Sequence, residues 1–137
     1  MNSLSPILLV EDDAVDVMTV KRCLKELKIP NQLVVAGNGE EALQLLLTEG
    51  ACRPCLILLD INMPKMNGLE FLQRLKIAPH LKKIPVVILT SSREESDITY
   101  CYETGIAGYM VKPVEYQHFV DIIKLLYGYW AKSELPQ

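Results

Sequence analysis

Residues 56–68 read LILLDINMPKMNG, which is four consecutive apolar residues followed by an aspartate and a stretch rich in turn formers. A short, continuous apolar run of this kind is typical of a parallel strand that is buried on both faces of its sheet. Open α/β sheets bind their ligands just outside the carboxyl ends of such strands. Asp60 stands at that end, so this stretch predicts both the fold class and the position of the chemistry.

Four further apolar runs have the same character. Together they predict strands over 7–10, 32–36, 56–59, 86–89 and 108–111. Helical patterns follow these strands, over 14–27, 39–48, 68–77, 92–104 and 115–129. Asn38 and Ser92 each precede a glutamate by three residues, a capping-box pattern that marks helix starts, and Gly105 marks a helix end. The alternation predicts an α/β fold of the flavodoxin-like (βα)5 kind, a doubly wound five-stranded parallel sheet of order 2-1-3-4-5.

The bulk properties exclude several classes of protein. The 137 residues are 50% hydrophobic and 23% charged, which is ordinary for one globular domain. We expect a single domain over 1–137, with its core over 7–127 and a C-terminal extension over 128–137. The net charge of −3 and the lack of a Lys/Arg cluster argue against direct binding of nucleic acid. No stretch resembles a signal peptide or approaches the ~20 apolar residues that span a bilayer, so we expect a cytoplasmic protein without membrane contact.

Residues 52–55 form a Cys-x-x-Cys pattern, which occurs in redox motifs and in zinc sites. A redox motif of this kind follows a strand and opens a helix, whereas this one precedes a strand. A zinc site would need two further ligands, and His80 and His118 are distant in the sequence. We therefore expect neither chemistry here, and we expect Cys23 and Cys101 to be small core residues.

Polar residues follow four of the five predicted strands. They are Glu11-Asp12-Asp13, Asp60, Thr90-Ser91 and Lys112-Pro113. The order 2-1-3-4-5 places the first and third strands side by side, so the acids after them converge. Their charges repel one another, and we expect at least one carboxyl pKa to rise.

A hard cation relieves this repulsion, and Mg²⁺ prefers oxygen ligands and retains several waters. We assign Asp12 and Asp60 as direct Mg²⁺ ligands and the backbone carbonyl of Asn62 as a third. Glu11 is expected to act through a water molecule. The acidic residues therefore predict a magnesium site.

The same edge suits a phosphoryl group. A carboxylate can attack phosphorus and form an acyl phosphate, which makes Asp60 the candidate phosphoacceptor. Lys112 supplies a compact positive charge and Thr90 a hydroxyl donor to phosphate oxygens. Metal, cation and hydroxyl together provide the charge neutralisation that phosphoryl transfer requires.

Each of these residues also has a purely structural interpretation. A single aspartate after a strand is more often a turn former or a helix cap, and Asp13 is expected to cap the first helix. Thr90 alone would bond to nearby backbone, and Lys112 alone would be a solvated charge. The joint supply of acid, hydroxyl and cation at one edge of a sheet favours a site.

The motifs VEDD at 10–13, LDINMP at 59–64, NG at 67–68, LTS at 89–91, GY at 108–109 and VKP at 111–113 occur in this order. From Ile7 to about Tyr127 the chain closely resembles the receiver domain of two-component response regulators. The resemblance implies that Asp60 is phosphorylated from the phosphohistidine of a histidine kinase, with Mg²⁺ required.

The resemblance also implies a conformational switch. Thr90 would move toward the phosphoryl group and Tyr109 would turn inward, so that the fourth helix, fifth strand and fifth helix report the signal. Ser91 stands where Ala or Gly is frequent in the family, which leaves the lifetime of the phosphorylated state open. Pro113, after Lys112, is a candidate for a cis peptide bond.

The C-terminal residues predict a partner surface. The aromatic side chains of Tyr116, Phe119, Tyr127 and Trp130 exceed what one helix face can bury within a domain. They favour a two-fold homodimer through the final helix and the neighbouring strand. The alternative is that this aromatic tail folds back on its own domain.

This ending resembles the stand-alone regulators that pair with bacterial phytochrome kinases. The expected partner is therefore a sensor histidine kinase, of the phytochrome type, or a phosphotransfer protein. We expect a bacterial stand-alone response regulator, and not an enzyme beyond assisting its own phosphorylation and dephosphorylation. One alternative is a Mg²⁺-dependent phosphatase, but that class needs an aspartate at the position of Asn62. The other is a scaffold that binds partners without phosphorylation.

Overall fold

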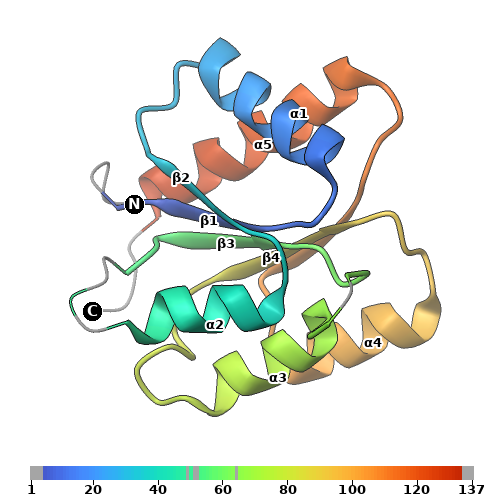
Figure 1. The fold of residues 1–137 in the computed structure, drawn as a ribbon. Helices are drawn as coiled ribbons and strands as arrows, with labels where there is room; N and C mark the ends of the chain where they lie inside the picture. Colours follow the sequence, from blue (N-terminus) through green and yellow to red (C-terminus); the bar gives the residue numbers. More distant parts are fainter. Residues whose placement is uncertain (1–4, 49, 51–52, 64, 134–137) are drawn as a thin grey trace.

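The computed structural model describes residues 5–48, 50, 53–63 and 65–133. Within these ranges, strands and helices alternate along the chain (Figure 1). The elements are β1 Ile7–Val10, α1 Ala14–Glu26, β2 Leu33–Ala36, α2 Gly39–Leu47, β3 Leu56–Leu59, α3 Gly68–Ile77, β4 Val86–Thr90, α4 Glu95–Thr104, β5 Gly108–Val111 and α5 Tyr116–Lys132.

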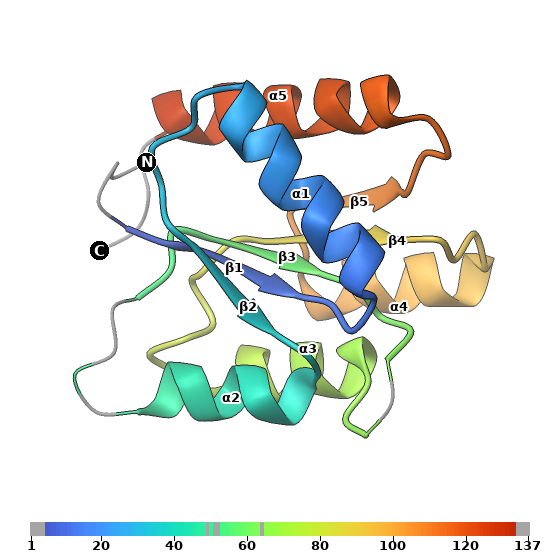
Figure 2. The same cartoon turned by 45° about the horizontal axis from the view of Figure 1, so that its top comes forward.

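The strands form one parallel sheet of order β2-β1-β3-β4-β5, which confirms the predicted topology. Helices α1 and α5 cover one face of the sheet, and α2, α3 and α4 cover the other (Figures 1 and 2). In the register of β1 and β3, Val10 lies opposite Leu59. The next residues, Glu11 and Asp60, therefore emerge together at the carboxyl edge of the sheet.

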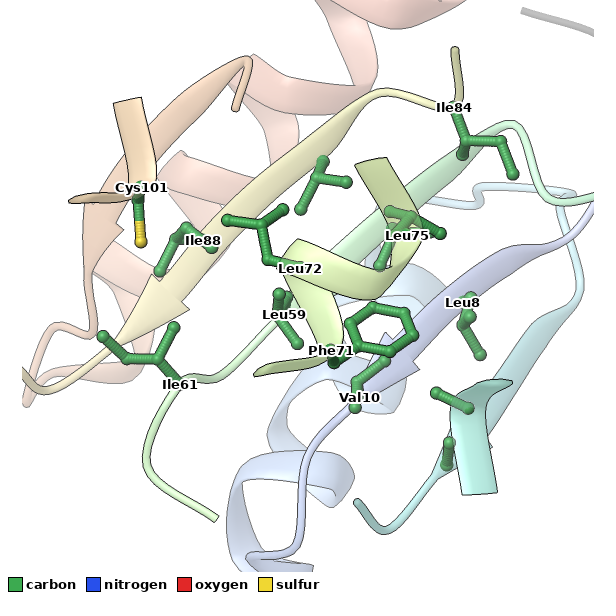
Figure 3. Packing of buried hydrophobic residues seen from close by; sticks show 14 of the residues in the cluster. Leu8, Val10, Leu59, Ile61, Phe71, Leu72, Leu75, Ile84, Ile88 and Cys101 are labelled. Atoms are coloured by element: carbon green, nitrogen blue, oxygen red, sulfur yellow. The ribbon is translucent and has the colours of Figure 1, made fainter. Parts of the chain in front are cut away.

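Two apolar clusters form the core, one on each face of the sheet. Successive residues of a strand point to opposite faces, so Val10 joins one cluster and Leu9 the other. Figure 3 shows Phe71 and Leu72 of α3 packed on the first cluster, where both are fully buried. Burial on both faces explains why the strands read as unbroken apolar runs.

The predicted core cysteines are confirmed, since Cys23 and Cys101 are both 0% exposed, one in each cluster. Cys55 is buried as well, and its thiol donates to the carbonyl of Pro6 at 3.4 Å. Cys52, the other half of the Cys-x-x-Cys pattern, lies outside the described residues. Cys55 thus serves to hold the chain before β1.

Three of the predicted helix boundaries are set as expected. Asp13 caps α1 by accepting from the amide of Val15 at 2.8 Å, and Asn38 caps α2 by accepting from the amide of Glu41 at 2.9 Å. Gly105 ends α4 with a φ of 114°, a left-handed conformation that favours glycine.

The predicted start of α4 is wrong. The helix begins at Glu95, not after Ser92, and no side chain caps it. Ser92 Oγ instead accepts from the amide of Glu94 at 3.3 Å and donates to Asp97 at 2.7 Å. The capping-box pattern is therefore used to shape the loop before α4 rather than to cap the helix.

The final helix is longer than predicted, because α5 continues to Lys132. Phe119 is 3% exposed in the cluster between the sheet, α1 and α5, so its assignment to a partner surface is wrong. Tyr116 and Trp130 pack against the same cluster, and the guanidinium of Arg22 lies 3.9 Å from the centre of the Tyr116 ring. Much of this aromatic set belongs to its own domain, because two helices share one face of the sheet.

Across the part of the chain that the structure describes, no helix combines the length and apolar character that a bilayer crossing requires.

Candidate functional site

Polar side chains are buried at the carboxyl edge of the sheet. Glu11 after β1, Asp60 after β3 and Thr90 at the end of β4 are 3%, 5% and 0% exposed. Buried polar groups are costly unless they have partners, so their concentration here requires compensation. The loop after β3 provides part of it, since the amide of Asn62 donates to Asp60 Oδ1 at 3.2 Å.

A close packing contact fixes this loop. A Cβ added to Gly68, the first residue of α3, would come within 2.4 Å of the Asp60 carbonyl oxygen and 2.5 Å of the Ile61 Cα. Both neighbours are backbone atoms that cannot move aside without moving Asp60. Gly68 is therefore required for the position of Asp60, a role that sequence analysis did not assign.

The acids converge as predicted. Glu11, Asp12 and Asp60 each offer a carboxylate oxygen, and these oxygens lie within 4.8 Å of one another. Burial raises the pKa of Glu11 to about 7, with a further contribution from the charge of Asp60, while the hydrogen bond from Lys112 opposes the shift. A carboxyl pKa is therefore raised as expected, but burial is the main cause and repulsion between the acids is a smaller one. Two buried carboxylates and an exposed one, converging within this distance, suit a hard divalent cation.

Lys112, after β5, is the cation of the site. Its Nζ lies 2.6 Å from Glu11 Oε2, 2.7 Å from Asp16 Oδ2 and 3.3 Å from Asp60 Oδ2. Burial alone would lower the pKa of Lys112, but the hydrogen bonds to Asp16 and Glu11 outweigh it and raise the pKa. The lysine is thus held charged beside Asp60, among more carboxylates than it can neutralise.

Sequence analysis missed Asp16. It lies in the first turn of α1, where an acidic residue is ordinarily assigned to the helix dipole. It follows Asp12, a predicted metal ligand, by four residues, which is about one helical turn. That spacing is the one signal that could have placed it near the site.

Thr90 connects the site to the loop before α4. Its hydroxyl donates to Asp60 Oδ1 at 2.7 Å, and the amide of Ser92 donates to Thr90 Oγ1 at 3.4 Å. The hydroxyl of the half-buried Tyr109 donates to the Ser92 carbonyl at 2.9 Å. A short chain of hydrogen bonds therefore joins Asp60 to Tyr109, while Ser91 is exposed beside it.

The expectation of a cis bond at Pro113 is wrong. None of the peptide bonds among the described residues is cis, so Lys112 and Pro113 are joined in the trans form. Trans is the intrinsically preferred form, by about 0.5–1 kcal/mol for a bond preceding proline.

The fold and site define a class of protein: a doubly wound α/β domain with carboxylates, a lysine and a hydroxyl at the carboxyl edge of its sheet. The model of the response regulator receiver domain family matches residues 7–124. The chain therefore belongs to this family, and it is a response regulator of a two-component phosphorelay.

Two known relatives match along most of their length. The response regulator Rcp1 of Synechocystis sp. is 36% identical over 131 residues, which are 93% of this chain and 89% of Rcp1. The structure of the phosphorylated cyanobacterial phytochrome response regulator RcpA has a TM-score of 0.91 at 35% identity, covering 98% of this chain and 99% of RcpA. The Mn²⁺-bound form of Rcp1 has a TM-score of 0.88 at 36% identity, covering 97% and 99%.

Proposed function

We propose that Asp60 is the phosphoacceptor through which this response regulator receives its signal. One observation carries the proposal: the Asp60 carboxylate lies at once within the acidic cluster, 2.7 Å from the Thr90 hydroxyl and 3.3 Å from the Lys112 ammonium. Nucleophile, hydroxyl donor and positive charge are thus assembled before any phosphodonor arrives.

The reaction is a transfer between two protein side chains. A carboxylate oxygen of Asp60 attacks the phosphorus of a phosphohistidine, the P–N bond breaks, and the imidazole leaves with the electron pair and takes a proton. Lys112 and Thr90 hold phosphoryl oxygens by an ion pair and a hydrogen bond. Thr90 carries the change to Tyr109 through Ser92, because the three are already joined by hydrogen bonds.

Mg²⁺ is the cofactor that we propose. Asp12 and Asp60 would bind it directly, with the backbone carbonyl of Asn62, and Glu11 through water. When bound, the ion neutralises charge on the transferring group. The convergence of three carboxylates supports this assignment, and so does the Mn²⁺-bound form of the relative Rcp1.

A sensor histidine kinase of the phytochrome type is the proposed phosphodonor, with a phosphotransfer protein as the other candidate. The likeness to the cyanobacterial phytochrome response regulator RcpA supports the phytochrome type. We propose one receiver domain with its core over 7–127, acting in the bacterial cytoplasm without direct contact to nucleic acid or membrane. It turns over no separate substrate, because the phosphatase class would need an aspartate where Asn62 stands.

We further propose a homodimer through the face formed by α4, β5 and α5. Tyr116, Tyr127 and Trp130 remain its candidate aromatic residues, whereas Phe119 is excluded by its burial. Exposed apolar side chains on α5 support the surface, with Leu125 69% exposed and Tyr129 66% exposed. Sedimentation velocity with and without phosphodonor tests it, and a monomer under both conditions would exclude it.

Labelling with acetyl phosphate tests the phosphoacceptor. The wild-type protein is expected to take up a phosphoryl group with Mg²⁺ and not with EDTA, and Asp60→Asn to take up none. Asp121→Asn, which removes an exposed carboxylate on α5, is the matched control and is expected to label like the wild type. Full labelling of the Asp60→Asn variant would exclude the proposal.

A further inference from the structure

Asp16 connects α1 to the end of β5, two elements that lie far apart in the sequence. Its Oδ2 is 2.7 Å from Lys112 Nζ, nearly as close as the Glu11 carboxylate at 2.6 Å and closer than Asp60 at 3.3 Å. The Asp16 side chain is 26% exposed and that of Lys112 is 11% exposed. The contact is therefore partly shielded from water.

Only some of the carboxylates that contact Lys112 also belong to the site proposed for the divalent cation. An ammonium has three N–H donors, and Lys112 lies within reach of three carboxylates. Two of these carboxylates, Glu11 and Asp60, belong to the acidic cluster that suits a divalent ion. A divalent ion and Lys112 therefore compete for the same two carboxylates, and their positive charges repel.

Asp16 is the partner of Lys112 that lies outside this cluster. We propose that Asp16 is a positioning residue for Lys112, an inference that rests on the metal site proposed above. It holds the ammonium on the α1 side of the site, so that a divalent cation can bind Asp60 directly and Glu11 through water without expelling the lysine. Lys112 then remains beside Asp60 when the phosphoryl group arrives.

A simpler role for Asp16 would be a favourable charge at the N-terminus of α1. The neighbouring Asp13 separates the two explanations, because it is a second carboxylate at the same helix end. Among the described residues, the carboxylates paired with Lys112 are those of Glu11, Asp16 and Asp60. Asp13→Ser keeps a side chain that can cap the helix and removes one negative charge near the site. Asp16→Asn removes the same charge and also the negatively charged partner of Lys112.

The experiment is a double-mutant cycle on Mg²⁺ affinity, measured by amide chemical shifts near residues 11–13, 60–62 and 112. Because Asp16 and Lys112 are charged residues in contact, we expect Asp16→Asn to weaken Mg²⁺ binding about fivefold in the wild-type background. Loss of one screened charge predicts about a twofold weakening for Asp13→Ser. In the Lys112→Met background, Asp16→Asn is expected to weaken binding only about twofold, because no lysine remains to be held.

The conservative variant Asp16→Glu retains the charge and is expected to bind Mg²⁺ within about twofold of the wild type. Circular dichroism and thermal unfolding of each variant show whether it is folded. Equal effects of Asp16→Asn and Asp13→Ser, or the same fivefold effect without Lys112, would overturn the inference while leaving the metal site intact. Failure of the wild type to bind millimolar Mg²⁺ would overturn the proposed metal site and this inference together.

Discussion

The two edges of the sheet both bury polar groups, but they satisfy them differently. At the amino edge, Asn31 Nδ2 donates to the Ser5 carbonyl at 2.8 Å, and the Cys55 thiol donates to the Pro6 carbonyl. These neutral bonds to backbone tie loops in place. At the carboxyl edge, Glu11 and Asp60 are buried beside a single lysine.

In this fold, the polar groups that hold loops in place and those that form the candidate site lie at opposite edges of the sheet. The neutral hydrogen bonds at the amino edge join side chains to backbone carbonyls and carry no net charge for an ion to balance. The carboxyl edge carries more negative than positive charge at short range, so its balance depends on what binds there. Variants at the two edges are therefore expected to respond differently to Mg²⁺.

The largest effect is expected from Gly68→Ala at the carboxyl edge. The new Cβ would meet backbone atoms of Asp60 and Ile61, so the loop must shift, at a cost of about 3 kcal/mol in the free energy of unfolding. Gly128→Ala in α5 is the control, because its Cβ meets nothing within 4 Å, and it is expected to stabilise by about 0.5–1 kcal/mol. Urea unfolding measures both, and equal stability of the two variants would contradict the assigned role of Gly68.

Lys112→Met tests whether the stability of the carboxyl edge depends on Mg²⁺. Without Mg²⁺ it leaves buried carboxylates without their cation, and we expect a loss of about 2 kcal/mol in the free energy of unfolding. Millimolar Mg²⁺ should raise its melting temperature more than that of the wild type, because the competing ammonium is gone. A variant whose melting temperature ignores Mg²⁺ would show that the carboxyl edge does not depend on an ion.

Asn31→Ala is the corresponding change at the amino edge. It removes the hydrogen bond to the Ser5 carbonyl and is expected to lower the free energy of unfolding by about 1–2 kcal/mol. Thermal unfolding should show the same loss with Mg²⁺ and with EDTA. A loss that Mg²⁺ repairs would remove the distinction between the two edges.

The smallest effect is expected from Ser92→Ala, which keeps the backbone bonds to Thr90 and Tyr109 and removes the hydroxyl bond to Asp97. We expect a loss of about 1 kcal/mol in the free energy of unfolding. Amide hydrogen exchange should increase in the first turn of α4 and remain unchanged in α5. Unchanged exchange in α4 would show that Ser92 does not anchor that helix.

The fold could be predicted because each strand is an unbroken apolar run, and the strand order then places Glu11, Asp12 and Asp60 together. Ser92 and Asp16 could not be assigned, because a serine before a glutamate and an acid in a first turn have common local explanations. The burial of Phe119 depends on how α1 and α5 share one face of the sheet. The helical spacing of Phe119, Ile122, Ile123 and Leu126 already indicated an apolar face of the last helix, so the assignment of Phe119 to a partner surface went against a local pattern.

Borohydride trapping shows directly whether the phosphoryl group resides on Asp60. Borohydride reduces an aspartyl phosphate to homoserine, which peptide mass spectrometry locates by residue. After incubation with Mg²⁺ and acetyl phosphate, the proposal predicts homoserine at position 60. Homoserine at position 12 or 16 instead, or labelling with no reduced residue at 60, would contradict it.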